Sequence, residues 1–136
     1  MYIIIAGCGR FGRQLALNLS NEGQDVAVID SDSSHFESLG SGFNGMEVAG
    51  MPFDEDVLQE AEVMNADAVA AVTDDDNVNL MISVIASNLY HIDRVLTRIS
   101  EPDKVSTFEK MGFRIICPIQ SASVKTEQML SGKEII

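Results

Sequence analysis

The sequence predicts an α/β fold built on a doubly wound, parallel, six-stranded sheet. Two observations support this prediction. Short apolar runs of strand length alternate along the chain with longer stretches of helical periodicity, as in a parallel sheet with helices on both faces. In addition, the first apolar run is followed at once by three closely spaced glycines, which suit a tight turn from a strand into a helix.

Six apolar runs are predicted to be strands, and they span residues 2–6, 26–30, 46–49, 68–72, 94–99 and 114–117. Helices are predicted over 10–21, 33–39, 54–63, 76–89, 101–111 and 121–130. With right-handed crossovers, this succession predicts the Rossmann-type strand order 3-2-1-4-5-6. Ligands of such folds bind at the carboxyl ends of the first and fourth strands. The loops expected there are 7–12, 30–34, 50–53 and 73–76.

The helical stretches carry their own start and stop signals. Over 10–21, Leu15 and Leu19 repeat at i and i+4, so one apolar stripe can lie on the sheet. The stretch 76–89 is strongly apolar, and the acidic residues at its start suit the positive end of a helix dipole. Pro102 falls in the first turn of the next helix, where its missing N–H costs no hydrogen bond.

Length and charge limit the classes of function. The 136 residues, 46% of them apolar, predict a single domain over 1–136. The net charge of −12 would repel nucleic acid and anionic lipid, so neither is expected as a partner. No run approaches the ~20 apolar residues that a membrane span needs, which predicts a cytoplasmic protein without direct membrane insertion. Only Cys8 and Cys117 are present, which predicts reduced thiols.

A glycine motif, Gly7-Cys8-Gly9-Arg10-Phe11-Gly12, follows the first predicted strand. In this G-x-G-x-x-G pattern, Gly7 permits the tight turn and Gly9 lets the backbone approach a pyrophosphate. Gly12 lets the helix pack closely against the strand. The free N–H groups of the helix N-terminus would bind the phosphates.

Asp30, followed by Ser31, ends the second predicted strand, 18 residues after Gly12. This spacing is close to the ~20 residues expected for a carboxylate that binds the ribose diol of a dinucleotide, and it argues against a 2′-phosphate. In the alternative reading, the glycines serve only a tight turn and Asp30 only caps the next helix.

Charged residues at the same sheet edge extend the candidate site. Arg10 could reach a terminal phosphate of its own ligand or of a neighbouring subunit's ligand, or it could be a solvated cation. Arg98 ends the fifth strand and could bind an anion or pair with a local acid. Thr73 and Asp74 are expected to line the cleft. The run 74–76 is interpreted as an acidic helix start rather than a Mg²⁺ site.

No catalytic or metal-binding residues are predicted. His35 and His91 have no partner at a recognisable spacing and are expected on the surface. Most of the seven methionines are expected in the core. Nothing resembles a catalytic triad, a phosphate-transfer lysine or a zinc motif, and a dehydrogenase would also need a substrate domain and a proton relay.

Several segments together resemble one family. They are GCGRFG at 7–12, VID at 28–30, AVTDDDNVNL at 71–80, TRI at 97–99, FEKMG at 108–112 and ICP at 116–118. These segments are similar to the N-terminal nucleotide-binding domain (RCK/KTN or TrkA-N) of Trk/Ktr-type potassium transport regulators. The resemblance covers nearly the whole chain.

The resemblance implies a non-enzymatic regulator on the cytosolic face of a membrane potassium channel or transporter. Such domains bind NAD(H), ATP, ADP or AMP, form homodimers and assemble into rings whose conformation depends on the ligand. The loop arginine, here Arg10, senses terminal phosphates. Dimer contacts are expected on the helices 76–89 and 101–111. The alternative function is the cofactor domain of an NAD-dependent oxidoreductase.

Two positions depart from the family pattern. The family often has Gly-Asp after the third strand, where this chain has Gly50-Met51-Pro52, so apolar packing against a base would replace a polar contact. The family often has Glu after the proline of the sixth strand, where this chain has Ile119. An intersubunit metal site that uses this acid is therefore not expected.

Overall fold

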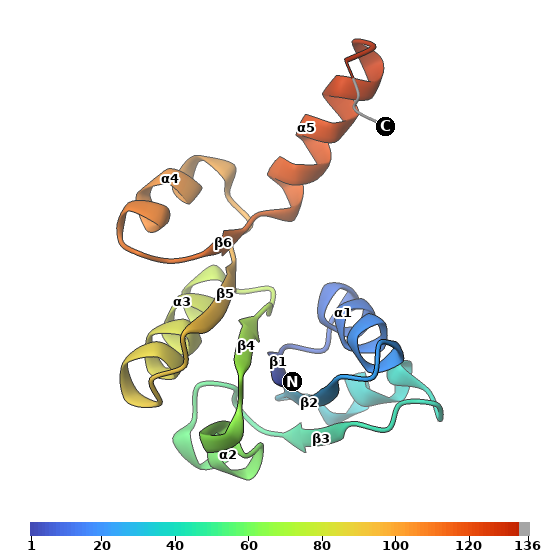
Figure 1. Ribbon diagram of the computed structural model, residues 1–136, viewed down its shortest axis with the longest axis vertical. Helices are drawn as coiled ribbons and strands as arrows, with labels where there is room; N and C mark the ends of the chain where they lie inside the picture. Colours follow the sequence, from blue (N-terminus) through green and yellow to red (C-terminus); the bar gives the residue numbers. More distant parts are fainter. Residues whose placement is uncertain (134–136) are drawn as a thin grey trace.

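A six-stranded parallel sheet forms the centre of the computed structural model, which describes residues 1–133 (Figure 1). The strands are β1 (Tyr2–Ala6), β2 (Asp25–Asp30), β3 (Met46–Ala49), β4 (Ala68–Ala71), β5 (Arg94–Arg98) and β6 (Ile115–Ile116). Their order is β3-β2-β1-β4-β5-β6, with every neighbouring pair parallel. The predicted fold class and strand order are confirmed.

Helical segments cover both faces of this sheet. The helical segments of the chain are α1 (Arg10–Asn21), η1 (Ser33–Leu39), α2 (Glu55–Glu60), η2 (Val63–Asn65), α3 (Asp76–Val84), η3 (Ile85–Leu89), α4 (Pro102–Lys110) and α5 (Pro118–Leu130). The segments α1 and η1 pack on one face, against alternate residues of β1 such as Ile5. The segments α2 and α3 pack on the other face, against residues such as Ile4. Because successive residues of a strand point to opposite faces, Ile4 and Ile5 are both fully buried.

The segments differ from the predicted ranges where local geometry intervenes. The stretch 33–39 is a 3₁₀ helix capped by Asp32, and 85–89 is a π-helical turn. The stretch 54–63 divides in two, because Glu62 adopts a left-handed conformation at φ 59° that no α-helix continues. The last strand is only two residues long, and α5 starts at Pro118 rather than 121, since proline suits the first helical turn.

The prediction that most methionines lie in the core is wrong. All seven are exposed, with exposed fractions from 37% at Met46 to 77% at Met64. The buried side chains of β1, β2 and β4 are instead isoleucine, valine and alanine. Small and β-branched side chains fill the pleated surface of a sheet efficiently, so the flexible thioethers stay outside.

Helix α5 extends away from the sheet like an arm (Figure 1), and none of its residues is buried. None of the helices over residues 1–133 combines the length and the apolarity required to span a bilayer. The six strands and the other helices lie within residues 1–117.

Glycine at position 12 is required by the contact between α1 and β1. A Cβ at Gly12 would lie 1.8 Å from the carbonyl oxygen of Gly7 and 3.3 Å from Val72 Cγ2. We therefore expect Gly12→Ala to lower the free energy of unfolding by at least about 1–3 kcal/mol, the usual cost of overpacking. Urea denaturation monitored by circular dichroism measures the change.

Gly42→Ala is the matched control, because a Cβ at Gly42 meets no atom within 4 Å and its φ is not positive. This variant should be neutral or slightly more stable. Equal stability of the two variants would contradict the close packing of α1 on the Gly7 turn.

Candidate functional site

Four loops meet at the carboxyl edge of the sheet around one cavity of about 260 Å³. They follow β1, β2, β3 and β4, as the strand order requires at the point where the winding reverses. The lining residues are Gly7, Gly9, Asp30, Ser31, His35, Met51, Pro52, Thr73, Asp74, Asp75 and Val78. The prediction that these four loops come together is thus confirmed.

The glycine loop forms one wall of the cavity. Gly7 has φ +113°, and a Cβ there would lie 2.9 Å from the backbone nitrogen of Thr73. Gly9 is exposed and begins α1 as its N-cap, without a side-chain acceptor for the first N–H groups of the helix. By contrast, Asp75 accepts hydrogen bonds at the start of α3. The N-terminus of α1 therefore keeps free donors at the edge of the cavity.

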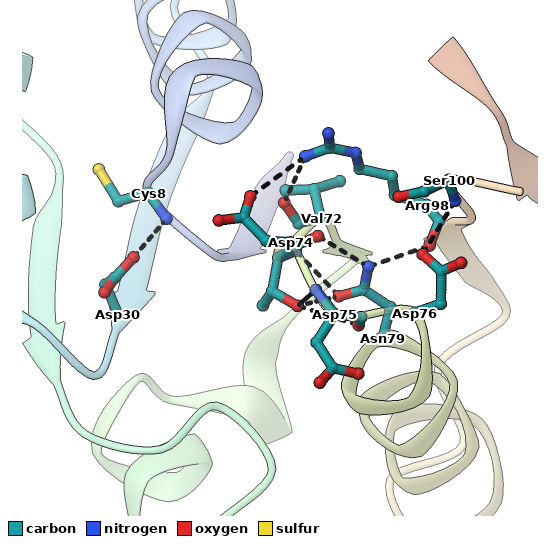
Figure 2. A network of polar contacts seen from close by, with 10 residues as sticks. Cys8, Asp30, Val72, Asp74, Asp75, Asp76, Asn79, Arg98 and Ser100 are labelled. Atoms are coloured by element: carbon teal, nitrogen blue, oxygen red, sulfur yellow. Dashed lines mark hydrogen bonds and ion pairs between the residues drawn. The ribbon is translucent and has the colours of Figure 1, made fainter. Parts of the chain in front are cut away.

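Asp30 is the buried carboxylate of the site, with 8% of its surface exposed. Its Oδ2 accepts a hydrogen bond of 2.8 Å from the Cys8 N–H (Figure 2). Its Oδ1 accepts a second bond of 2.8 Å from the Asp32 N–H. These bonds hold the carboxylate between the glycine loop and the start of η1, so its position is fixed by backbone on both sides.

His35 was expected to be a surface histidine without a partner, and the second half of this expectation is wrong. Its side chain is half exposed, but its Nδ1 lies 3.0 Å from Asp30 Oδ1 and its Nε2 lies 3.4 Å from Asp32 Oδ2. The hydrogen bond to Asp30, followed by the charge of the same residue, raises the pKa of His35 above 6.5. No sequence motif indicates this contact, because a 3₁₀ helix rather than an α-helix brings residues 30 and 35 together.

Asn79 is a second residue that the sequence reasoning missed as part of the site. Its amide is completely buried. Its oxygen accepts from the Thr73 N–H at 2.9 Å, and its nitrogen donates to the Thr73 and Arg98 carbonyls at 3.0 and 2.9 Å. This single side chain therefore fixes the loop after β4 against the end of β5.

Of the acidic run 74–76, Asp75 caps the start of α3, in agreement with the predicted acidic helix start. Asp75 Oδ1 accepts from the N–H groups of Asn77 and Val78, and Asp76 Oδ1 accepts from the Ser100 N–H at 2.8 Å. Asp74 caps nothing, and its side chain is 98% exposed. Over residues 1–133, no three acidic, histidine or cysteine side chains are grouped closely enough to hold a metal ion.

Arg98 approaches the glycine loop from β5. Its guanidinium lies 5.4 Å from the ring centroid of Phe11 and 3.9 Å from Asp74 Oδ1. Of the two predicted roles of Arg98, the ion pair with a local acid is therefore formed.

Two other predicted residues lie outside the cavity lining. Arg10, on the first turn of α1, is exposed and is absent from the lining. Gly50 lies beside the cavity next to Met51, which is exposed and lines it.

Cys8 is buried and is not suited to act as a nucleophile. Burial, with the nearby charge of Asp30, raises the pKa of the Cys8 thiol to about 11. The reactive thiolate is therefore scarce at neutral pH.

The cavity as a whole presents three kinds of group to a ligand. Asp30 supplies hydrogen-bond acceptors, the start of α1 supplies N–H donors, and Met51 and Pro52 supply apolar surface.

The chain has the features of the dinucleotide-fold class of domains. These are a Rossmann-type sheet, a glycine loop that opens a helix, and an acidic residue at the end of β2. Within this class, the family model of the TrkA-N domain matches residues 3–118. The chain belongs to the TrkA-N domain family.

Sequence relatives agree with this assignment. The chain is 38% identical over 120 residues to the Trk system potassium uptake protein TrkA of Streptomyces coelicolor, covering 88% of this chain and 54% of that protein. It is 36% identical over 111 residues to the TrkA homolog of Pyrococcus abyssi, covering 82% and 49%. The chain spans about half the length of these relatives.

Solved structures share the fold at low sequence identity. The TrkA-N domain of the inner membrane protein ybaL from Escherichia coli has a TM-score of 0.83 at 17% identity, covering 95% of this chain and 96% of that one. The Kef C-terminal domain of Shewanella denitrificans in an AMP-bound form has a TM-score of 0.74 at 19% identity, covering 98% and 83%. The GsuK channel bound to NAD has a TM-score of 0.70 at 20% identity, covering 86% and 21%.

The contact between His35 and Asp30 leads to a measurable titration. We expect the ring of His35 to titrate above pH 6.5, and Asp30→Asn to lower its pKa, because the amide removes the negative charge. The contact stabilises the fold below the unfolded-state pKa, and this stabilisation is lost as pH rises through the raised folded-state pKa. NMR titration of the His35 ring carbon resonances measures this pKa in the parent protein and in the Asp30→Asn variant.

Asp32→Asn is the matched control for this titration. Asp32 lies farther from the ring, at 3.4 Å, and its charge is a smaller cause of the shift. This variant should lower the pKa of His35 less than Asp30→Asn does. The reverse order would show that Asp30 is not the main partner of the ring.

Proposed function

We propose that this chain is a regulatory domain that binds an adenine nucleotide, either NAD(H) or one of ATP, ADP and AMP. The observation that carries the proposal is the cavity at the winding reversal, where the buried Asp30 carboxylate faces the uncapped N-terminus of α1. Acceptors for a ribose and donors for phosphates stand side by side there.

Asp30 is proposed to bind the ribose hydroxyls. A carboxylate has about four acceptor positions, and the N–H groups of Cys8 and Asp32 and the ring of His35 occupy three of them. One hydroxyl can therefore donate to Asp30 directly. A second can donate when the half-exposed His35 ring turns away, so His35 and the diol compete for the same oxygen.

The glycine loop is proposed to hold the phosphates. Gly7, Gly9 and Gly12 keep side chains out of this wall, and the N–H groups at the start of α1 supply donors with a partial positive charge. Arg10, exposed on the same turn, can reach a terminal phosphate. The opposite walls supply Ser31 from β2 and Thr73 from β4.

The base is proposed to pack on the apolar part of the cavity. Met51, Pro52 and Val78 form this surface, and the chain passes beside it through Gly50. Met51 stands where the family often has an acidic residue. Apolar contact, rather than a polar bond, would therefore hold the adenine ring.

The regulatory role is proposed from the family. Relatives named as potassium uptake proteins carry this domain as about half of their length. We propose that the domain acts in the cytoplasm, on the cytosolic face of a membrane potassium channel or transporter subunit. There it would form homodimers and higher rings, with exposed Met81, Val84 and Leu89 on α3 and η3 and Met111 after α4 as contact residues. A nucleotide controls such an assembly when it binds one arrangement more tightly than the other.

Nucleotide binding is tested by thermal shift. We expect NAD, NADH, AMP, ADP or ATP, added at ~100 times its dissociation constant, to stabilise the fold by ~2.7 kcal/mol. Asp30→Ala should abolish the shift, because it removes the acceptor for the ribose. Asp25→Ala, at the exposed opposite end of the same strand, should retain it. A full shift with Asp30→Ala would contradict the ribose assignment.

Two measurements test the regulatory role: the oligomeric state of the chain with each nucleotide, and the oxidation of NADH. We expect nucleotide identity to change the dimer or ring population, as measured by light scattering after gel filtration. NADH should not be oxidised in the presence of small carbonyl substrates, because the proposed role is nucleotide sensing rather than hydride transfer. Steady oxidation of NADH would favour the oxidoreductase alternative.

A further inference from the structure

Asp74 stands beside the part of the cleft where the glycine loop lies open. A Cβ built on Gly9 would have one neighbour within 4 Å, the Asp74 Oδ1 at 3.8 Å. The Asp74 side chain is 98% exposed, and within residues 1–133 its one polar side-chain partner is Arg98. Unlike Asp75 and Asp76, it caps no helix and anchors no loop, so the fold gives it no structural task.

Arg98 holds a fixed place on the other side of this carboxylate. Its guanidinium packs over the Phe11 ring, and its Nη1 lies 3.5 Å from the Val72 carbonyl (Figure 2). Within residues 1–133, its Nε is the one buried side-chain nitrogen or oxygen that no hydrogen-bond partner reaches. The guanidinium is therefore held in place by the Phe11 ring and the Val72 carbonyl. Its Nε still has no hydrogen-bond acceptor in the described part of the chain.

A phosphate on the glycine loop would come close to both of these charges. Asp74 would repel it and Arg98 would attract it, and the neighbouring carboxylates of Asp75 and Asp76 add negative potential. The repulsion grows with the charge of the phosphate chain. ATP carries more negative charge than NAD, whose pyrophosphate is esterified at both ends.

We propose that the Asp74–Arg98 pair makes the site select ligands by phosphate charge, with Asp74 disfavouring ATP relative to NAD(H). This inference rests on the proposed nucleotide site. An incoming phosphate would displace the exposed Asp74 carboxylate from Arg98 and take its place. The energetic cost of this exchange is greater for a triphosphate, because its greater negative charge is repelled more strongly by the remaining acids.

The test measures dissociation constants of ATP and NAD by calorimetry, with EDTA present so that divalent cations do not neutralise the phosphates. We expect Asp74→Asn to tighten ATP binding about two- to fivefold, the range of one exposed charge contact. NAD binding should change less than twofold. Arg98→Gln should weaken ATP more than NAD. Addition of NaCl should narrow the difference between ATP and NAD in the parent protein.

Glu109→Gln on α4 is the control, since it removes the same charge at an exposed position away from the cleft. It should leave the ratio of the two constants unchanged, and circular dichroism should show that all variants fold. Equal changes for ATP and NAD in Asp74→Asn, or no change, would overturn the charge selection while leaving nucleotide binding intact. Absence of binding by the parent protein would overturn the proposed function itself.

Discussion

The close approach of Gly12 to the carbonyl of Gly7 is the contact on which the site depends. It lets α1 start directly at the end of β1 and lie on one face of the sheet. Helix α3 leaves the neighbouring strand β4 toward the other face. The two loops therefore diverge from adjacent strands, and the space between them is the cavity that Asp30 and Thr73 line from either side.

The backbone N–H and C=O groups of the loops at the carboxyl edge of the sheet need hydrogen-bond partners that do not fill the cavity. The fold meets this requirement with side chains that bind backbone groups. Asp30 accepts from the Cys8 and Asp32 N–H groups, and Asn79 binds Thr73 and the Arg98 carbonyl. Both side chains are nearly or completely buried. The loops are thus preorganised, so a ligand would not have to order them, which lowers the entropic cost of binding.

Much of this arrangement could be predicted from the sequence for identifiable reasons. Strands buried on both faces are continuous apolar runs, so β1, β2 and β4 were predicted within one or two residues. The glycine loop and Asp30 were found because their spacing reflects one strand, one helix and a second strand. The four loops of the cavity then followed from the strand order alone.

The residues that were missed depend on geometry that spacing does not encode. His35 reaches Asp30 because the intervening turn is a 3₁₀ helix, and Asn79 reaches Arg98 across 19 residues of sequence. The methionine prediction was wrong because apolar character alone does not tell whether a side chain faces the core. Met81 and Leu89, in the strongly apolar stretch 76–89, are 47% and 49% exposed.

The distribution of sulfur atoms has a consequence for oxidative damage. Both thiols, Cys8 and Cys117, are at most 4% exposed, whereas every methionine is accessible. An oxidant would therefore meet thioethers before thiols and produce methionine sulfoxides, which reductases can restore. Because none of these methionines fills the core, their oxidation would make the surface more polar and leave the packing of the sheet intact.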